Sequence, residues 1–175
     1  NWGYSQFRPL QEEIINSLIH GNDTLALLPT GGGKSITFQV PALALDGITI
    51  VISPLIALMV DQVENLLKRN IPAAAIHSGL SPREIDVIVH RCIYGNDIKL
   101  LYVSPERLQT SSFKANLSKM NVSFIAVDEA HCISQWGYDF RPPYLLISSI
   151  RDIFPNVPIL ALTATATPVV VNDIV

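Results

Sequence analysis

Apolar residues gather along the chain in short runs rich in β-branched side chains, separated by longer segments of helical period. Short apolar runs bounded by turn residues are typical of strands that are buried on both faces of a sheet. The expected strands are Thr24–Leu28, Ile48–Ser53, Ala73–His77, Ile98–Val103, Phe124–Asp128 and Pro158–Thr163. The segments between them are expected to be helices, at Pro9–His20, Lys34–Leu45, Leu55–Asn70, Pro82–Tyr94, Pro142–Phe154 and from Thr167 onward.

Several of the expected helices open with residues that favour a helix start. Pro82 and Pro168 suit the first turn of a helix, and Ser81 and Thr167 directly before them can cap it. Alternation of strands and helices predicts an α/β fold with a parallel sheet, right-handed crossovers and helices on both faces. Because no linker or internal repeat interrupts this pattern, residues 1–175 are expected to form a single domain.

The composition agrees with a sheet that is buried on both faces. Hydrophobic residues make up 49% of the chain and charged residues 15%, against about 25% charged residues in an average domain. The low charge also fits a domain whose surface is partly covered by another part of the protein. The net charge of −3 gives no hint of a nucleic-acid partner. A protein that contacts nucleic acid through backbone groups, hydroxyls and stacking nevertheless needs no strongly basic surface.

The cysteines and the two ends of the chain bear on where the protein works and on whether the sequence is part of a longer one. Cys92 and Cys132 stand far apart without metal-ligand spacing, which argues against a disulfide framework or a zinc site. No apolar stretch reaches transmembrane length and no signal peptide opens the chain. We therefore expect an intracellular protein without a membrane partner, in the cytoplasm of a bacterium or the nucleus of a eukaryote. The start at Asn1 and the end within an apolar segment indicate a piece of a longer protein.

The residues that follow each expected strand carry the first sign of function. In parallel sheets, ligands bind outside the carboxyl ends of the strands. Those positions read LPTGGGKS, SPLIAL, HSGLS, SPERL, DEAHC and TATATP. Most of these segments are rich in small, hydroxyl or charged residues, so the sequence predicts a polar site at this edge of the sheet.

The segment after the first strand is a predicted phosphate-binding loop, Pro29–Ser35. Its consecutive glycines allow backbone N–H groups to turn inward as an anion nest, and the helix that follows adds its positive end. Lys34 can reach the β- and γ-phosphates, and the Ser35 hydroxyl can ligate Mg²⁺. Leu28 stands where the pattern G-x-x-x-x-G-K-[ST] has its first glycine. A plain glycine-rich turn is therefore the alternative.

Asp128 and Glu129 form a carboxylate pair at the end of another expected strand. An Asp in this place, beside a phosphate loop, can hold the Mg²⁺ shell. Glu129 is then a candidate general base that orients the attacking water. The alternative is an acidic pair that caps the next helix. His131 could couple the γ-phosphate site to the next strand, or it could simply pack.

The phosphate loop, the DEAH sequence and the following TAT segment resemble the first motor domain of superfamily 2 helicases, a RecA-like P-loop NTPase domain. The stretch DEAHCISQWGYDFRPPY, residues Asp128–Tyr144, is similar to the RecQ family of DNA helicases, in which an aromatic-rich loop directly follows the DEAH box. The opening residues resemble the motif that contacts adenine in that family: Trp2, Gly3, Tyr4, Phe7, Arg8, Pro9 and Gln11.

The resemblance implies an ATP-dependent DNA helicase that uses Mg²⁺, moves 3′ to 5′ along single-stranded DNA and unwinds duplex or branched DNA in repair and recombination. The nucleotide-binding residues that it implies are Arg8, Gln11, Thr30, Gly31, Gly32, Gly33, Lys34 and Ser35, with Ser35 and Asp128 on the metal. The catalytic residues are Lys34, Asp128, Glu129 and His131. The DNA-contacting or coupling residues are Ser53, Pro54, Trp136, Tyr138, Phe140, Arg141, Thr163 and Thr165. A second RecA-like domain, which this sequence does not contain, would complete the motor.

The aromatic residues Trp136, Tyr138 and Phe140 recur at every second position, and Arg141 follows them. One interpretation is a stacking platform for the bases of a single strand, with Arg141 near a phosphate or over a ring. The alternative is a short strand whose aromatic face packs into the core. Attachment to the carboxylate pair favours the platform, because a loop tethered to Glu129 could sense DNA and shift the catalytic groups.

Two other functions stay open. The chain could belong to a superfamily 2 RNA helicase or duplex translocase, although the aromatic loop argues against it. It could also be a nucleotide-binding module without motor activity, although the intact Lys34, Asp128 and Glu129 argue against degeneracy. In isolation the chain is expected to turn over little ATP, because in such motors a transition-state arginine comes from the second domain.

Overall fold

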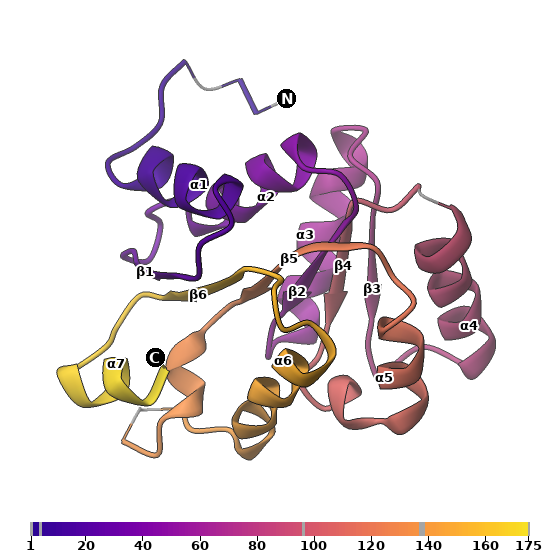
Figure 1. Cartoon of the computed structure of the whole chain (residues 1–175). Coiled ribbons are helices and arrows are strands. Elements are labelled where there is room, and N and C mark those ends of the chain that lie inside the picture. Colours follow the sequence, from indigo (N-terminus) through magenta and orange to yellow (C-terminus); the bar gives the residue numbers. More distant parts are fainter. Residues whose placement is uncertain (1, 4, 96, 137–138, 175) are drawn as a thin grey trace.

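The computed structural model describes residues 2–3, 5–95, 97–136 and 139–174. Six parallel strands form one sheet in the order β1-β6-β5-β2-β4-β3 (Figure 1). The strands are β1 (Thr24–Leu27), β2 (Ile48–Ile52), β3 (Ala73–Ile76), β4 (Leu100–Val103), β5 (Val122–Val127) and β6 (Ile159–Thr163). Every expected strand is thus present, and the α/β prediction of a parallel sheet is confirmed.

The helices cover both faces of the sheet (Figure 1). They are α1 (Gln11–Ile19), α2 (Lys34–Ala44), α3 (Ile56–Lys68), α4 (Pro82–His90), α5 (Ser111–Leu117), α6 (Ile150–Ile153) and α7 (Pro168–Ile174). One cluster of buried side chains joins α1, α2 and α3 to residues such as Val51 of β2. A second cluster, on the other face, joins α4, α5 and α6 to Ile50 and Ile52 of the same strand. Apolar side chains on both faces explain the continuous apolar runs of the sequence.

Three of the expected helices differ from their predicted form. The helix predicted at Pro9–His20 begins only at Gln11, because Leu10 before it has a φ of 68° and lies outside the helical region. The helix predicted at Pro82–Tyr94 ends its α-helical part at His90 and continues as a π-helical turn, Arg91–Gly95. At its start, Ser81 caps α4 as predicted.

The segment predicted as a helix at Pro142–Phe154 is a 3₁₀-helix at Pro142–Ser149 that continues into the short α6. Its buried residues Tyr144, Ile147 and Ile150 are spaced by three, the period of a 3₁₀-helix. The helix α5 was missing from the prediction, because it is a single short segment with few apolar residues. Phe113 and Leu117 bury it against the sheet.

The sheet brings the predicted functional segments to one edge. β6 lies between β1 and β5, with Leu27 paired to Thr163 and Val127 paired to Ala161. The carboxyl ends of these three strands therefore meet, and the residues that follow them share one site. None of the helices in the described part of the chain has the length and apolar character needed to span a membrane.

Candidate active site

The loop between β1 and α2 has the backbone geometry that a phosphate cradle requires. Gly31 and Gly33 both have a φ of 77°, a left-handed conformation that glycine adopts without strain. A Cβ on Gly32 would lie 2.8 Å from the carbonyl oxygen of Pro29. α2 begins at Lys34, so its N-terminal N–H groups and the positive end of the helix face the loop. Phosphate binding by this loop, against the alternative of a plain glycine-rich turn, stays a prediction.

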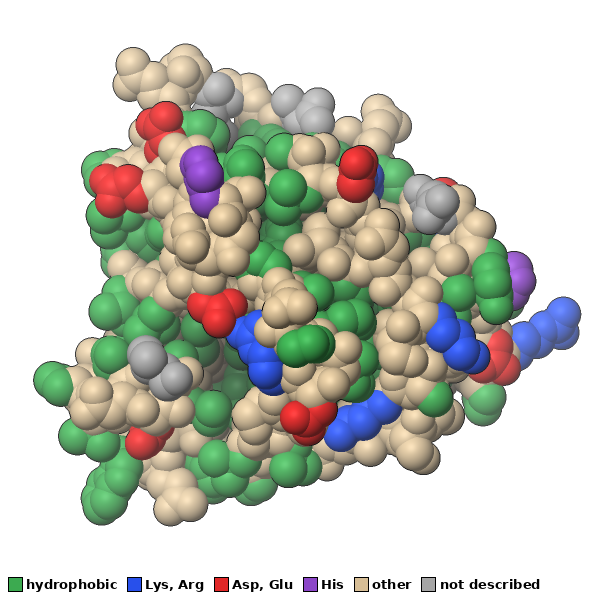
Figure 2. All heavy atoms as spheres, viewed as in Figure 1, with side chains coloured by type: hydrophobic (Ala, Val, Ile, Leu, Met, Phe, Trp, Pro, Cys, Tyr) green, Lys and Arg blue, Asp and Glu red, His purple; other side chains and the backbone are tan. Residues whose placement is uncertain are grey.

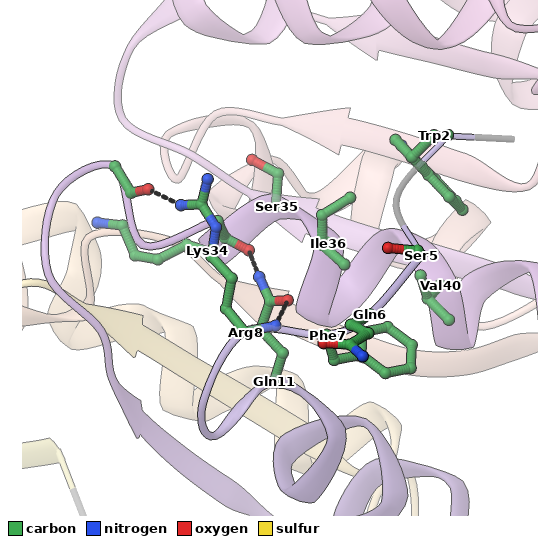
Figure 3. A pocket seen from close by; sticks show the side chains of 13 residues that line it. Trp2, Ser5, Gln6, Phe7, Arg8, Gln11, Lys34, Ser35, Ile36 and Val40 are labelled. Atoms are coloured by element: carbon green, nitrogen blue, oxygen red, sulfur yellow. Dashed lines mark hydrogen bonds between the residues drawn. The ribbon is translucent and has the colours of Figure 1, made fainter.

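The N-terminal segment holds the carbonyl groups of this loop (Figure 3). The Arg8 guanidinium donates a hydrogen bond to the Gly31 carbonyl. The Gln11 side-chain amide, which is 4% exposed, donates to the carbonyls of Gly32 at 3.3 Å and Gly33 at 3.1 Å. The side-chain oxygen of Gln11 accepts a hydrogen bond from the backbone N–H of Arg8 at 2.9 Å. In this conformation Gln11 therefore orients the loop, and a bond to an adenine edge stays a prediction.

Between the N-terminal segment and α2 lies a cavity of about 690 Å³ (Figure 3). Phe7, Ile36 and Val40 are among its apolar lining residues, whereas Arg8, Lys34 and Ser35 supply polar groups. This volume lies within the range of about 300–1,000 Å³ typical of small-molecule sites. An elongated ligand with an aromatic part and an anionic part fits such a lining.

The carboxylate pair lies directly opposite the phosphate loop. Glu129 Oε1 is 3.2 Å from Lys34 Nζ, and both side chains are mostly buried. Glu129 itself has a φ of 50°, an uncommon conformation for a residue other than glycine. Its backbone N–H donates to Asp128 Oδ1 at 3.0 Å, which holds the Asp128 carboxylate against the backbone of Glu129. Non-glycine residues in such conformations cluster at functional sites.

Asp128 lies at the end of β5, where its N–H donates to the Ile52 carbonyl at 2.9 Å. Burial, and then the neighbouring Glu129 carboxylate, raise the pKa of Asp128 above its ordinary value, while Lys34 opposes this shift. A nearby cation would favour the ionised carboxylate. The hydroxyl of the fully buried Tyr144 donates to the Asp128 carbonyl at 2.9 Å and anchors the strand end.

A series of close polar contacts joins the carboxylate pair to β6. His131 Nδ1 lies 3.3 Å from Glu129 Oε2 and 3.0 Å from Thr163 Oγ1. The Thr163 hydroxyl donates to the Thr165 carbonyl at 3.0 Å and accepts from the Thr165 N–H at 3.3 Å. His131 thus contacts both segments, and its role as a coupling residue stays a prediction.

The hydroxyl of Ser35 and the carboxylate of Asp128 are hard oxygen donors of the kind that Mg²⁺ prefers. Within the described residues no group of three or more His, Cys, Asp or Glu side chains could hold a metal ion. This donor set fits Mg²⁺ better than a metal with an all-protein cage, because Mg²⁺ in nucleotide sites keeps several waters and binds the phosphates.

The segment after the DEAH box does not form a strand in its described part, and Trp136 is 80% exposed. The alternative of an aromatic face packed into the core is therefore wrong for Trp136. Phe140 is partly buried. Tyr138 lies outside the described residues, and the prediction for it stays untested. An exposed tryptophan agrees with a stacking role without demonstrating one.

Arg141, which is predicted to lie near a phosphate or over a ring, makes two contacts within the chain. Its Nη1 donates to the Pro54 carbonyl at 3.2 Å, and its Nη2 lies 3.4 Å from Asp139 Oδ2. Pro54, which with Ser53 is a predicted DNA contact, is thus linked to the aromatic loop. The buried Ser53 hydroxyl has no hydrogen-bond partner among the described residues. DNA contact by these residues remains a prediction.

One polar connection was not predicted from the sequence. Trp2 Nε1 donates to Gln39 Oε1 at 3.1 Å, and Gln39 Nε2 donates to Gln62 Oε1 at 2.9 Å. Gln39 is 5% exposed, and its side chain joins α2 both to α3 and to the start of the chain at Trp2. The signal was a single glutamine within the otherwise apolar stretch that follows Thr37.

Comparisons with known proteins agree with this geometry. Residues 8–174 match the family described as DEAD/DEAH box helicase. The chain is 49% identical over 173 residues to "ATP-dependent DNA helicase RecQ" of Haemophilus influenzae, covering 99% of this chain and 28% of that protein. It is 48% identical over 173 residues to the protein of the same name from Pasteurella multocida, with 99% and 27% covered.

Among solved structures, the DUF1998 helicase MrfA bound to DNA and AMPPNP superimposes with a TM-score of 0.80 at 16% identity, covering 98% of this chain and 26% of that one. At this identity the likeness shows the fold alone. The chain spans little more than a quarter of the length of the RecQ relatives. The family match covers nearly the whole sequence, and the phosphate loop, DEAH box and TAT segment meet in one site. The chain therefore belongs to the DEAD/DEAH box helicase family, and within it is similar to the RecQ DNA helicases.

Proposed function

We propose that this chain is the ATP-binding motor domain of a RecQ-like DNA helicase, which couples ATP hydrolysis to 3′-to-5′ movement along single-stranded DNA and to unwinding of duplex or branched DNA. One observation carries the proposal. Lys34 of the phosphate loop contacts Glu129 at 3.2 Å, and Glu129 opens the segment that presents the exposed Trp136. A nucleotide site and a candidate strand-binding side chain thus share one short piece of backbone.

In the proposed ATP complex, the loop Pro29–Ser35 surrounds the phosphates with backbone N–H groups. Ser35 and Asp128 would hold Mg²⁺, which would supply positive charge to neutralise the phosphates. The apolar wall of the cavity, with Phe7 and Val40, takes the base. Thr30 is exposed at the entrance of the loop and can contact a phosphate.

Lys34 has two competing anionic partners in this scheme. Without nucleotide its ammonium group pairs with the Glu129 carboxylate. A bound γ-phosphate offers a denser negative charge, so Lys34 turns to it and releases Glu129. The freed carboxylate then orients the attacking water as a general base. The Lys34–Glu129 ion pair is therefore the arrangement without nucleotide, and nucleotide binding breaks it.

The chain Glu129–His131–Thr163 links this event to the rest of the domain. His131 Nδ1 lies close to both Glu129 and Thr163. A movement of Glu129 therefore changes which of the two His131 contacts. Thr163 holds Thr165 by two hydrogen bonds and so passes the change to the segment after β6. Because Trp136 lies on the same segment as His131, strand binding and hydrolysis can influence each other.

The proposed partners follow from this scheme. On the face shown in Figure 2 acidic and basic side chains are interspersed, which suits sequence-blind contacts with a single strand better than wrapping of a duplex. A second RecA-like domain would close the nucleotide site and supply the transition-state arginine. The whole protein would work where DNA is kept, in the cytoplasm of a bacterium or the nucleus of a eukaryote.

The steady-state ATPase activity of the full-length protein, measured with single-stranded DNA, with RNA and with neither, tests the proposed function. We expect clear stimulation by DNA and little by RNA. Stronger stimulation by RNA would favour an RNA helicase, and an absence of turnover under all three conditions would favour a nucleotide-binding module. The 175 residues alone are expected to hydrolyse little ATP, and robust DNA-stimulated turnover by them would contradict the proposed role of a second domain.

A further inference from the structure

The hydroxyl of Ser134 connects the aromatic loop to the last helix of the chain. It donates a hydrogen bond of 2.6 Å to Asp173 Oδ2 on α7 and accepts one of 3.2 Å from the N–H of Trp136. Ser134 is fully buried, whereas Asp173 lies at the surface. A hydroxyl is suited to this position because it can donate and accept at once.

These contacts join two segments that are also joined within the active site. Ser134 follows His131 in the segment after β5, and α7 follows Thr165 in the segment after β6. Figure 1 shows α7 beside the segment after β5. The segments are therefore connected twice, at His131–Thr163 beside the carboxylates and at Ser134–Asp173 beside the aromatic loop.

The second connection lies next to the base of the aromatic loop. The base of the loop is closed by the Arg141 N–H, which donates to the Cys132 carbonyl at 2.9 Å. Beyond this base, the hydrogen bond to Ser134 holds the Trp136 backbone while its ring is exposed. An exposed ring on an unheld backbone would lose more conformational freedom on stacking with a base, and binding would weaken.

We propose that Ser134 and Asp173 are a positioning pair that holds the backbone of Trp136 in the orientation in which the aromatic loop engages single-stranded DNA. The inference rests on the proposed function and extends it to residues on α7. The Asp173 carboxylate is a charged acceptor, which makes its bond to a hydroxyl stronger than a neutral one. A movement of the segment after β6 is thereby transmitted to the loop that contacts the strand.

The test uses the full-length protein and the single-stranded DNA concentration that gives half-maximal stimulation of ATP hydrolysis. Ser134→Ala and Asp173→Ala should each raise this concentration about five- to tenfold, the lower part of the range typical of coupling between sites. The double variant should lose no more than Ser134→Ala, because that change alone already removes both hydrogen bonds of the Ser134 hydroxyl. Hydrolysis without DNA and the KM for ATP should stay within about twofold, since neither residue touches the nucleotide site.

Two matched variants separate positioning from charge and from general damage. Asp173→Asn keeps an acceptor oxygen without the negative charge, so it should retain most of the DNA response. A loss of repulsion alone would instead improve DNA binding in both Asp173 variants. Asn172→Ala, at the exposed neighbouring position on α7, should behave as the wild type. Amide hydrogen exchange of residues 132–136 without DNA should rise in Ser134→Ala and Asp173→Ala but not in Asn172→Ala.

The outcomes distinguish the positioning pair from the function on which it rests. If DNA stimulates the wild type and the two alanine variants respond at the same DNA concentration, the positioning pair is overturned and the proposed function stands. If DNA does not stimulate the wild type, the proposed function is overturned and the pair with it. Equal losses in Asp173→Asn and Asp173→Ala would also count against a role that depends on the hydrogen bond.

Discussion

The phosphate loop and the aromatic loop both leave the same edge of the sheet, yet the chain holds them in different ways. Neighbours enclose the phosphate loop: Arg8 and Gln11 bind its carbonyls, and Glu129 binds Lys34. Its backbone is fixed before any ligand arrives. A small ligand of constant shape, such as a triphosphate, is best served by a cradle of this kind.

The aromatic loop is instead fixed at its base and free at its tip. Backbone and side-chain bonds hold Arg141 and Ser134, whereas the ring of Trp136 is 80% exposed. A partner whose bases vary in identity and position cannot be met by a rigid pocket, and an exposed ring tolerates any base. The contrast predicts that changes in the two loops will separate chemistry from strand binding.

Glu129→Gln in the full-length protein should have the largest effect. The amide cannot act as a general base, so kcat for ATP should fall by about 10²–10⁴-fold, while nucleotide affinity changes little. Steady-state hydrolysis and binding of a fluorescent ATP analogue measure the two quantities. Glu64→Gln, at an exposed carboxylate of α3, is the matched control. A kcat within tenfold of the wild type would remove Glu129 from the proposed role.

Trp136→Ala, in the aromatic loop, should affect strand binding rather than chemistry. Loss of stacking, worth roughly 1–3 kcal/mol per base, should raise the single-stranded DNA concentration for half-maximal stimulation by about 5- to 150-fold. Trp136→Phe keeps a ring and should recover part of the response. If Trp136→Ala retained full DNA-stimulated hydrolysis at the DNA concentrations that suffice for the wild type, the proposed coupling through the aromatic loop would fail.

Gln11→Ala should produce an intermediate effect confined to the nucleotide. The variant loses bonds to the phosphate-loop carbonyls and any contact with the base, so the KM for ATP should rise by about tenfold. A comparison with GTP separates these causes, because only the contact with adenine favours ATP. Gln6→Ala, at an exposed residue of the same cavity wall, should change the KM far less. An equal loss for ATP and GTP would assign Gln11 to loop support alone.

The two loops also differ in how far the sequence predicts them. Pro29–Ser35 is contiguous, and glycine, lysine and a hydroxyl act there through local geometry, so its form and place could be predicted. The strands could be predicted for the same reason, since each carries its own apolar run. The support of the loop by Arg8 and Gln11 needed the structure, because these contacts join residues that lie far apart in sequence.

The residues that hold the aromatic loop come from distant segments, and no local sequence pattern predicts these contacts. Asp173 reads as an ordinary surface residue on α7, and Arg141 reads as a free cation although it binds the Pro54 carbonyl. Spacing alone even allowed a buried strand at Trp136, which is in fact exposed. Local chemistry was thus predictable from the sequence, whereas the direction of an exposed loop depended on tertiary contacts.

Ser81→Ala should have the smallest effect and tests whether either loop responds to stability alone. The Ser81 hydroxyl accepts from the Glu84 N–H, and the Glu84 carboxylate accepts from the Ser81 N–H at 2.8 Å. Loss of such a cap lowers the free energy of unfolding by about 1 kcal/mol, which the midpoint of denaturant unfolding would show.

The bonds from Ser81 lower the pKa of Glu84, so the cap is at full strength above the ordinary pKa of a glutamate and weakens as the pH falls through the lowered value. The difference between variant and wild type should therefore shrink in acid. Because α4 lies far from both loops in sequence and carries none of their contacts, kcat and the DNA response should stay unchanged. A shift in either one would mean that the effects expected for Trp136→Ala and Gln11→Ala include a general loss of stability.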